Sequence, residues 1–193
     1  AWKEEEIGRI GEERFRREYG CEFLVFDETL INSLHLTEME GITPTLQMGQ
    51  TRFYTKISPD KNYAIALDPS MGTGGDYSAI QVVELPTYIQ VAEWQHNTTS
   101  IPGQIRVLKD ICDYIAKERG DDSGIYWSGE NNGIGEACLI VIKEHGEENI
   151  TGMISSEPMR KGNGRKFRQG FKTKNCAKEN ASSNLKTTGG KKK

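Results

Sequence analysis

The sequence lacks several patterns that define common classes of protein. No run of residues approaches the roughly 20 apolar residues that a membrane span needs, and the N-terminus, rich in Glu and Lys, has no apolar signal region. The four cysteines form no CxxC pair, and their spacings suit no zinc site. We therefore expect a protein without a membrane partner that is not secreted and works in a reducing cytoplasm.

Other absences restrict the chemistry. No Gly-Lys-Ser/Thr follows the glycine-rich stretch at residues 72–75, which argues against a nucleotide-binding P-loop. His35, His96 and His145 are too scattered in the sequence to form a site. The net charge of the 193 residues is only −3, so the molecule as a whole is not an electrostatic binder of nucleic acid. A site, if present, must be built mainly from carboxylates.

The charge that is present is distributed unevenly. Residues 172–193 are basic, contain one leucine and show no periodicity, which predicts an irregular or disordered tail. A basic cluster lies just before this tail. Such a cluster is ordinarily a solvated surface, but its place beside the acids makes binding of nucleic-acid phosphates an equal alternative. Its members are Arg160, Lys161, Arg165, Lys166 and Arg168.

Hydrophobic periodicity predicts a mixed α/β domain. Expected helices span residues 2–20, 101–118 and 134–145, and expected strands span residues 21–26, 63–67, 79–85, 88–95, 125–128 and 153–155. From residue 62 onward the order β-β-β-α-β-α-β is that of the ribonuclease H-like fold. There, a three-stranded hairpin sheet continues into parallel strands, and helices cover both faces of the mixed sheet.

Acidic residues follow two of the expected core strands. Asp68 ends the first strand and opens a glycine-rich turn that leads to Asp76, and Glu130 ends the fourth strand before another glycine turn. Right-handed crossovers bring the ends of these two strands together, so Asp68 and Glu130 should be neighbours although they lie far apart in sequence. Glycines 72, 74 and 75 would let a nucleic-acid backbone approach.

Carboxylates in this arrangement suit a hard divalent cation. Two such ions, Mg²⁺ or Mn²⁺, held roughly 3.5–4 Å apart, cleave phosphodiesters by activating water and stabilising the leaving oxygen. Asp68 would bridge the ions, Glu130 would complete one coordination sphere, and Asp76 would be a third ligand or would orient water. Simpler interpretations stay open: Asp68 as part of an ordinary turn, and Asp76 as a loop cap.

Four segments together resemble the large terminase subunits of tailed phages, the DNA-packaging motors of the T-even-like group. Residues 10–24 resemble the end of their ATPase region, and residues 27–31 the start of their interdomain link. Residues 63–78 resemble their first nuclease strand with its Asp-x₇-Asp turn, and residues 126–133 the strand that bears their second acid. The similarity covers residues 2–171.

The resemblance implies a domain plan. Residues 1–26 would be a remnant of the ATPase domain, without its ATPase motifs. Residues 27–61 would be the interdomain linker, residues 62–171 the ribonuclease H-like nuclease domain, and residues 172–193 a basic tail. By the same resemblance, Asp68 and Glu130 match two of the family's three catalytic acids, and Asp76 matches an additional acid in the same turn.

The family also implies an activity and partners. The chain would be a Mg²⁺- or Mn²⁺-dependent endodeoxyribonuclease that cuts concatemeric double-stranded DNA during genome packaging. It would work with the portal protein and the small terminase subunit, in the host cytoplasm and transiently at the procapsid portal. The family's third acid has no counterpart in this sequence. This motivates an alternative, a catalytically incomplete DNA-binding or portal-docking module; a junction resolvase-like nuclease is a further alternative.

Overall fold

The computed structural model describes residues 2–11, 15, 19, 40–161 and 164–170, which fall into two units, one within residues 1–41 and one within residues 42–177. In the first unit, α1 (Trp2–Ile10) matches the start of the helix predicted for residues 2–20. The ring of Trp2 lies edge-on to those of Phe15 and Tyr19, with centroids 5.9 and 5.5 Å away. The strand predicted for residues 21–26 lies outside the described residues.

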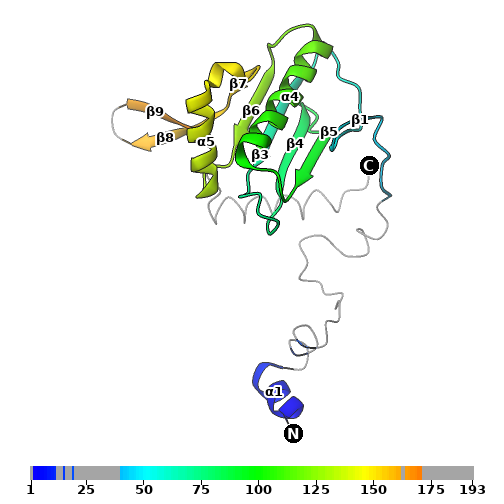
Figure 1. Cartoon of the computed structure of the whole chain (residues 1–193), viewed down its shortest axis with the longest axis vertical. Coiled ribbons are helices and arrows are strands. Elements are labelled where there is room, and N and C mark those ends of the chain that lie inside the picture. The colour runs from blue at the N-terminus through cyan, green and yellow to red at the C-terminus, as the bar shows by residue number, and fades with distance from the viewer. Residues whose placement is uncertain (1, 12–14, 16–18, 20–39, 162–163, 171–193) are drawn as a thin grey trace. The chain divides into compact units, whose positions relative to one another are not determined.

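A seven-stranded mixed sheet forms the centre of the second unit (Figure 1). Its strand order is β1-β2-β5-β4-β3-β6-β7. β4 lies between β3 and β5 and is antiparallel to both, β6 pairs parallel with β3, and β7 pairs parallel with β6. The strands are β1 (Leu46–Met48), β2 (Thr51–Phe53), β3 (Asn62–Asp68), β4 (Ser78–Leu85), β5 (Gln90–His96), β6 (Ile125–Gly129) and β7 (Met153–Ile154). This arrangement confirms the predicted ribonuclease H-like α/β fold.

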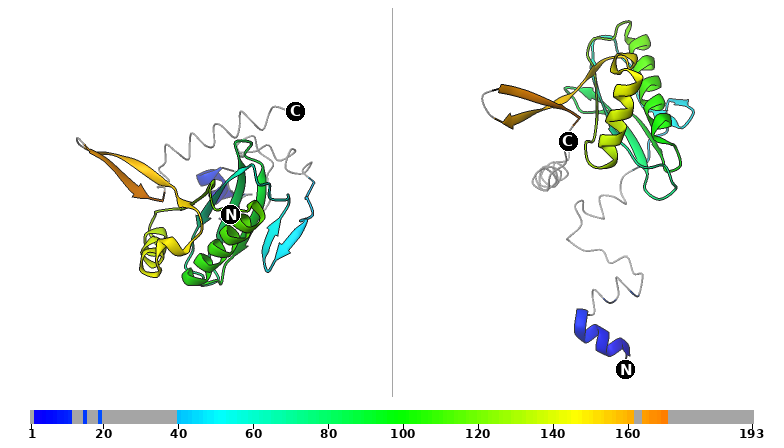
Figure 2. Two further views of the ribbon diagram at one scale, coloured as in Figure 1. Left: turned by 90° about the horizontal axis from the view of Figure 1, so that it is seen from above. Right: turned by 60° about the vertical axis from the view of Figure 1, so that its left-hand side comes forward.

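Two helices connect the parallel strands. Helix α4 (Ile101–Arg119) links β5 to β6, and α5 (Ile134–His145) links β6 to β7. Both lie on the same face of the sheet (Figures 1 and 2), so the expectation of helices on both faces is wrong for the described residues. The reason is geometric: both crossovers step toward β7, and right-handed connections that step in one direction place their helices on one face.

The core lies between this helix layer and the sheet. In β3, side chains alternate, with Tyr63, Ile65 and Leu67 buried against the helices. Helix α4 contributes a stripe at helical spacing, residues 104, 108, 111, 112 and 115, each at most 1% exposed. The helix ends at Gly120, whose φ of 89° lets its N–H donate to the Ala116 carbonyl at 2.9 Å.

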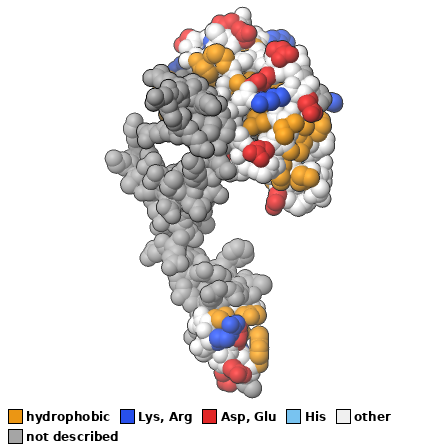
Figure 3. Space-filling model, turned by 90° about the vertical axis from the view of Figure 1, so that its left-hand side faces the viewer, with side chains coloured by type: hydrophobic (Ala, Val, Ile, Leu, Met, Phe, Trp, Pro, Cys, Tyr) orange, Lys and Arg blue, Asp and Glu red, His pale blue; other side chains and the backbone are white. Residues whose placement is uncertain are grey.

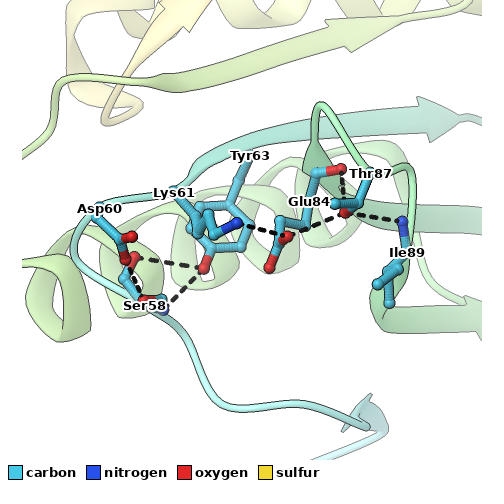
Figure 4. A network of polar contacts seen from close by, with 7 residues as sticks. All are labelled: Ser58, Asp60, Lys61, Tyr63, Glu84, Thr87 and Ile89. Carbon is cyan, nitrogen blue, oxygen red and sulfur yellow. Dashed lines mark hydrogen bonds and ion pairs between the residues drawn. The ribbon is translucent and has the colours of Figure 1, made fainter.

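Polar contacts fix the start of β3, at the end of the sheet opposite Asp68 (Figure 4). The Tyr63 hydroxyl accepts a hydrogen bond from the Ser58 N–H at 2.8 Å. Lys61 Nζ lies 3.5 Å from Glu84 Oε1 on β4, and the Thr87 hydroxyl donates to the same carboxylate at 2.9 Å. The Lys61–Glu84 ion pair joins the start of β3 to β4 next to the position where Asn62 pairs with Leu85, so it supports the register that places Asp68 at the far end.

The sheet extends beyond the strands expected from the sequence. β1 and β2 lie in the segment predicted as linker, residues 27–61, and β2 pairs with β5, with Phe53 opposite Ala92. After η1 (Glu147–Asn149) and β7, the chain forms a separate hairpin of β8 (Ser156–Lys161) and β9 (Gly164–Gln169). Among the described helices, none combines the length and apolar character that crossing a membrane requires. The predicted tail, residues 172–193, lies outside the described residues.

Candidate metal centre

Asp68 and Glu130 are neighbours at one end of the sheet. In the parallel ladder between β3 and β6, Leu67 pairs with Gly129, so each acid occupies the next position of its own chain. The Glu130 N–H donates to the Leu67 carbonyl at 2.9 Å, which extends the ladder to the acid itself. Chain order and right-handed crossovers predicted that the two strand ends would meet, and the parallel register of β3 and β6 places them side by side.

Strand alternation gives the two acids the same side of the sheet. The side chains of residues 63, 65 and 67 on β3 and of residues 125 and 127 on β6 are buried beneath the helices. Asp68 and Glu130 therefore belong to the opposite face, where Asp68 is exposed and Glu130 is half-buried. The positions that precede the acids on this face carry small side chains, those of Ala66 and Ser128.

The backbone around Glu130 is closely packed. The Asn132 side-chain amide donates to Glu130 Oε1 at 2.7 Å, which orients the carboxylate. At Gly135, in the first turn of α5, a Cβ atom would lie 1.7 Å from the Glu130 carbonyl oxygen and 3.8 Å from the Pro69 ring. The start of α5 thus packs closely against the backbone at the end of β6.

The glycine-rich turn after Asp68 is fastened to the segment that precedes α4. A Cβ atom at Gly72 would lie 2.1 Å from the Thr99 carbonyl oxygen, and Gly72 has a φ of 68°. The Gly74 N–H donates to the Asn97 carbonyl at 2.8 Å, and the Asn97 side chain donates back to the Gly74 carbonyl at 3.1 Å. The sequence analysis expected these glycines to let a nucleic-acid backbone approach. In the structure, the backbone that lies against Gly72 and Gly74 is that of residues 97–99 of the protein itself.

Asp76 does not complete a trio in this structure. It is exposed in the loop between β3 and β4, and within residues 40–161 and the other described positions no three His, Cys, Asp or Glu side chains come close enough to hold a metal ion. His96 is also placed elsewhere, with Nδ1 2.6 Å from the Thr99 hydroxyl. The roles of Asp68, Glu130 and Asp76 as metal ligands stay predictions.

The donor set fits part of a hard-cation site. Mg²⁺ takes oxygen ligands and keeps several waters, so it is bound by one or two carboxylates together with substrate phosphates rather than by a closed protein cage. Asp68 and Glu130 provide two carboxylates at the ends of adjacent parallel strands. Such a pair suits one ion; a second ion needs ligands in addition to these two carboxylates.

The basic cluster occupies the β8–β9 hairpin, as the register of that hairpin shows. Arg160 pairs with Arg165, position 159 with Lys166, and position 157 with Arg168. The base of the hairpin is bonded to the acid-bearing strand: the Asn131 side chain donates to the Gln169 carbonyl at 3.0 Å, and the Ser155 N–H donates to the Trp127 carbonyl at 2.7 Å. The hairpin thus starts beside Glu130.

The surface of the described residues carries both signs of charge. On the face shown in Figure 3, acidic and basic side chains are interspersed with apolar ones, and the coloured atoms form no large block of one sign. This agrees with the near-neutral net charge of −3. Affinity for a polyanion must therefore come from a local group of cations rather than from the field of the whole molecule.

Cys112 and Cys138 are buried free thiols, as the sequence predicted. Burial raises the pKa of the Cys112 thiol to about 12, helped by the nearby Asp113 charge, and burial raises the pKa of Cys138 to about 11. Because the thiolate is the reactive form, both should resist iodoacetamide at mildly alkaline pH in the folded protein and react after denaturation. Peptide mass spectrometry of each cysteine checks this; rapid labelling of either one in the native chain would contradict the burial described here.

Sequence reasoning missed Asn132, which bonds to the Glu130 carboxylate, and also Gln104. Gln104 lies on the apolar stripe of α4, four residues before Leu108, and it is fully buried beside the Asp68 turn. An uncharged polar side chain on an otherwise apolar helix stripe was a readable signal, because such a group must find hydrogen bonds inside the protein.

The fold and the paired acids define a ribonuclease H-like sheet with carboxylates at the ends of two parallel strands. The fold is similar to that of solved phage proteins. The large terminase nuclease from the thermophilic phage G20c with bound cobalt aligns with a TM-score of 0.55 and 19% identity, over 85% of this chain and 71% of that chain. The same nuclease with bound magnesium aligns with a TM-score of 0.54 and 18% identity, over 85% and 71%. No family model matches the sequence.

Proposed function

We propose that the sheet domain is the metal-dependent endonuclease domain of a phage terminase large subunit. The observation that carries the proposal is the register that makes Asp68 and Glu130 neighbours at the end of β3 and β6. The similarity in fold to the terminase nuclease of phage G20c supports the same activity, and the bound magnesium and cobalt in those structures support a divalent metal here.

The mechanism assigns each part of the site a separate task. Asp68 and Glu130 would hold Mg²⁺ or Mn²⁺ at the ends of β3 and β6, and Asp76 would orient water or add a ligand when DNA is bound. When bound, such ions, of which two are expected, would activate water and stabilise the leaving oxygen. The Asn132 amide orients the Glu130 carboxylate.

The hairpin supplies the proposed DNA contact. Arg160, Lys161, Arg165, Lys166 and Arg168 lie on β8 and β9, and cations of this kind bind phosphates without reading sequence. Because the hairpin base is bonded to residues flanking Glu130, a duplex held by these cations would pass close to the acids. We accordingly propose double-stranded DNA as the substrate, cut with little sequence preference.

The biological setting follows from the sequence resemblance and is the finer part of the proposal. The domain would cut concatemeric DNA before and after filling of the capsid in a packaging motor of the T-even-like kind. The portal protein and the small terminase subunit would be its partners, and it would act in the host cytoplasm and transiently at the procapsid portal.

The direct test is cleavage of supercoiled plasmid DNA by the full chain. We expect nicked and then linear plasmid in Mn²⁺ or Mg²⁺, and none when EDTA removes the metal, because the carboxylates alone provide no nucleophile. Agarose electrophoresis of a time course measures both steps. Cleavage that continues in EDTA would contradict a metal mechanism, and a preference for four-way junctions over linear duplexes would favour a resolvase.

The incomplete acid group favours a second candidate, a DNA-binding module without catalysis. Among the described residues the site has two neighbouring carboxylates rather than three. In this case calorimetry would detect no binding of Mn²⁺, whereas DNA affinity measured by fluorescence anisotropy would persist and fall as salt rises. The plasmid assay and these two titrations together separate the module from the nuclease.

A further inference from the structure

Gln104 is buried at a position where an apolar residue would be expected. Its side chain is 0% exposed and lies on the same stripe of α4 as Leu108 and Ile111. Burying an amide without hydrogen bonds costs about 1–3 kcal/mol in proteins, so such a residue is tolerated where it makes specific bonds. Gln104 makes three of them.

All three bonds of the Gln104 amide go to backbone groups near Asp68. Its Nε2 donates to the Ser70 carbonyl at 2.8 Å and to the Thr99 carbonyl at 2.7 Å. Its Oε1 accepts from the Ser70 N–H at 3.3 Å. The Gln104 side chain thus bonds to both the backbone N–H and the backbone carbonyl of Ser70, and its bond to Thr99 links Ser70 to the segment before α4.

These bonds hold the chain where it leaves the sheet. Ser70 follows Asp68 by two residues, with Pro69 between them, whose ring fixes φ. On one side of Asp68 the ladder between β3 and β6 fixes the backbone; on the other side Gln104 fixes it. Ser70 is itself 3% exposed, and its hydroxyl accepts the Gly72 N–H at 3.3 Å, which passes the constraint into the glycine turn.

We propose that Gln104 is a positioning residue for the metal centre: it holds the Asp68 turn in the conformation that lets Asp68 and Glu130 share a cation. This role rests on the proposed metal-dependent function. Gln104 itself has no contact with the metal or with DNA, because its whole amide is engaged beneath the turn. Its effect on metal affinity passes through the backbone of Ser70.

Two substitutions separate shape from hydrogen bonding. Gln104→Leu keeps much of the volume and removes all three bonds, which leaves Ser70 and Thr99 with unpaired buried groups. Gln104→Glu keeps the shape, but an ionised carboxylate cannot donate to the two carbonyls. The control is Ile115→Ala, which removes a fully buried side chain from the same stripe of α4 at a distance from the Asp68 turn.

Mn²⁺ affinity, measured by calorimetry on the full chain, is the main readout. Loss of a residue that supports a ligand commonly weakens metal affinity about 10–100-fold, and we expect a loss in this range for Gln104→Leu and Gln104→Glu. DNA affinity in EDTA should stay at the wild-type value. Ile115→Ala should lower the unfolding temperature but leave Mn²⁺ affinity unchanged.

Hydrogen exchange provides a readout independent of metal. In Gln104→Leu the amides of Ser70 and Gly72 should lose protection, whereas in Ile115→Ala they should keep it. Equal Mn²⁺ affinity in wild type and Gln104→Leu would overturn the positioning role of Gln104 but leave the proposed metal centre intact. A wild-type chain that binds no Mn²⁺ would overturn the metal centre and this role together, and unchanged exchange would show that Gln104 does not hold the turn.

Discussion

Asp68→Asn should abolish metal-dependent cleavage while leaving the fold intact. Asn keeps the size of Asp but loses the negative charge that attracts a hard cation. Metal stabilisation of the transition state is worth several kcal/mol, and each 1.36 kcal/mol is tenfold in rate, so the cleavage rate should fall by about 10²-fold or more. Because Asp68 is exposed at the end of β3, the unfolding temperature should change little.

A matched control removes the same charge elsewhere. Asp122 is also exposed and lies just before β6, at the end of the sheet opposite Asp68. Asp122→Asn should retain wild-type cleavage and wild-type Mn²⁺ affinity. Plasmid time courses and calorimetric titrations of the three proteins measure the effect. If the Asp68→Asn protein cleaved at the wild-type rate, Asp68 would not be a catalytic residue. If both variants lost the same amount of activity, the loss would come from the change in net charge and not from the position of Asp68.

Patterns within single elements were readable from the sequence, and so was the meeting of two strand ends. The alternation in β3 and the helical stripe of α4 report burial directly, because each face of an element has a fixed period. The neighbourhood of Asp68 and Glu130 followed from chain order and right-handed crossovers. These features depend on local periodicity and on one topological rule.

The missed features depend on contacts distant in sequence. β1 and β2 are three residues each, too short for a periodic signal, and β2 belongs to the sheet only because it pairs with β5. The hairpin of β8 and β9 was taken as a basic segment because charged residues hide strand alternation. To predict that both helices lie on one face, one must know the order of all the strands in the sheet, and the sequence does not give that order.

Gly135→Ala should destabilise the domain and also weaken metal binding. Alanine usually favours a helix over glycine by about 1 kcal/mol, so propensity alone predicts a gain. At this position, however, the added Cβ would lie 1.7 Å from the Glu130 carbonyl oxygen, which is backbone and cannot rotate away. Overpacking of this kind costs about 1–3 kcal/mol, occasionally more. Because the clash is with backbone, we take the upper end, about 3 kcal/mol. Subtracting the gain in helix propensity of about 1 kcal/mol leaves a net loss of about 2 kcal/mol in the free energy of unfolding.

The control for Gly135→Ala is Ala137→Gly on the same helix. Ala137 is exposed, so this change costs only about 1 kcal/mol of helix propensity and should leave Mn²⁺ affinity unchanged. In Gly135→Ala, relief of the clash must move the start of α5 or the end of β6, and Glu130 moves with the latter. Urea unfolding and calorimetry measure both effects. Stabilisation by Gly135→Ala would mean that the contact between α5 and Glu130 is looser than described, and that Glu130 is not held by the helix that follows it.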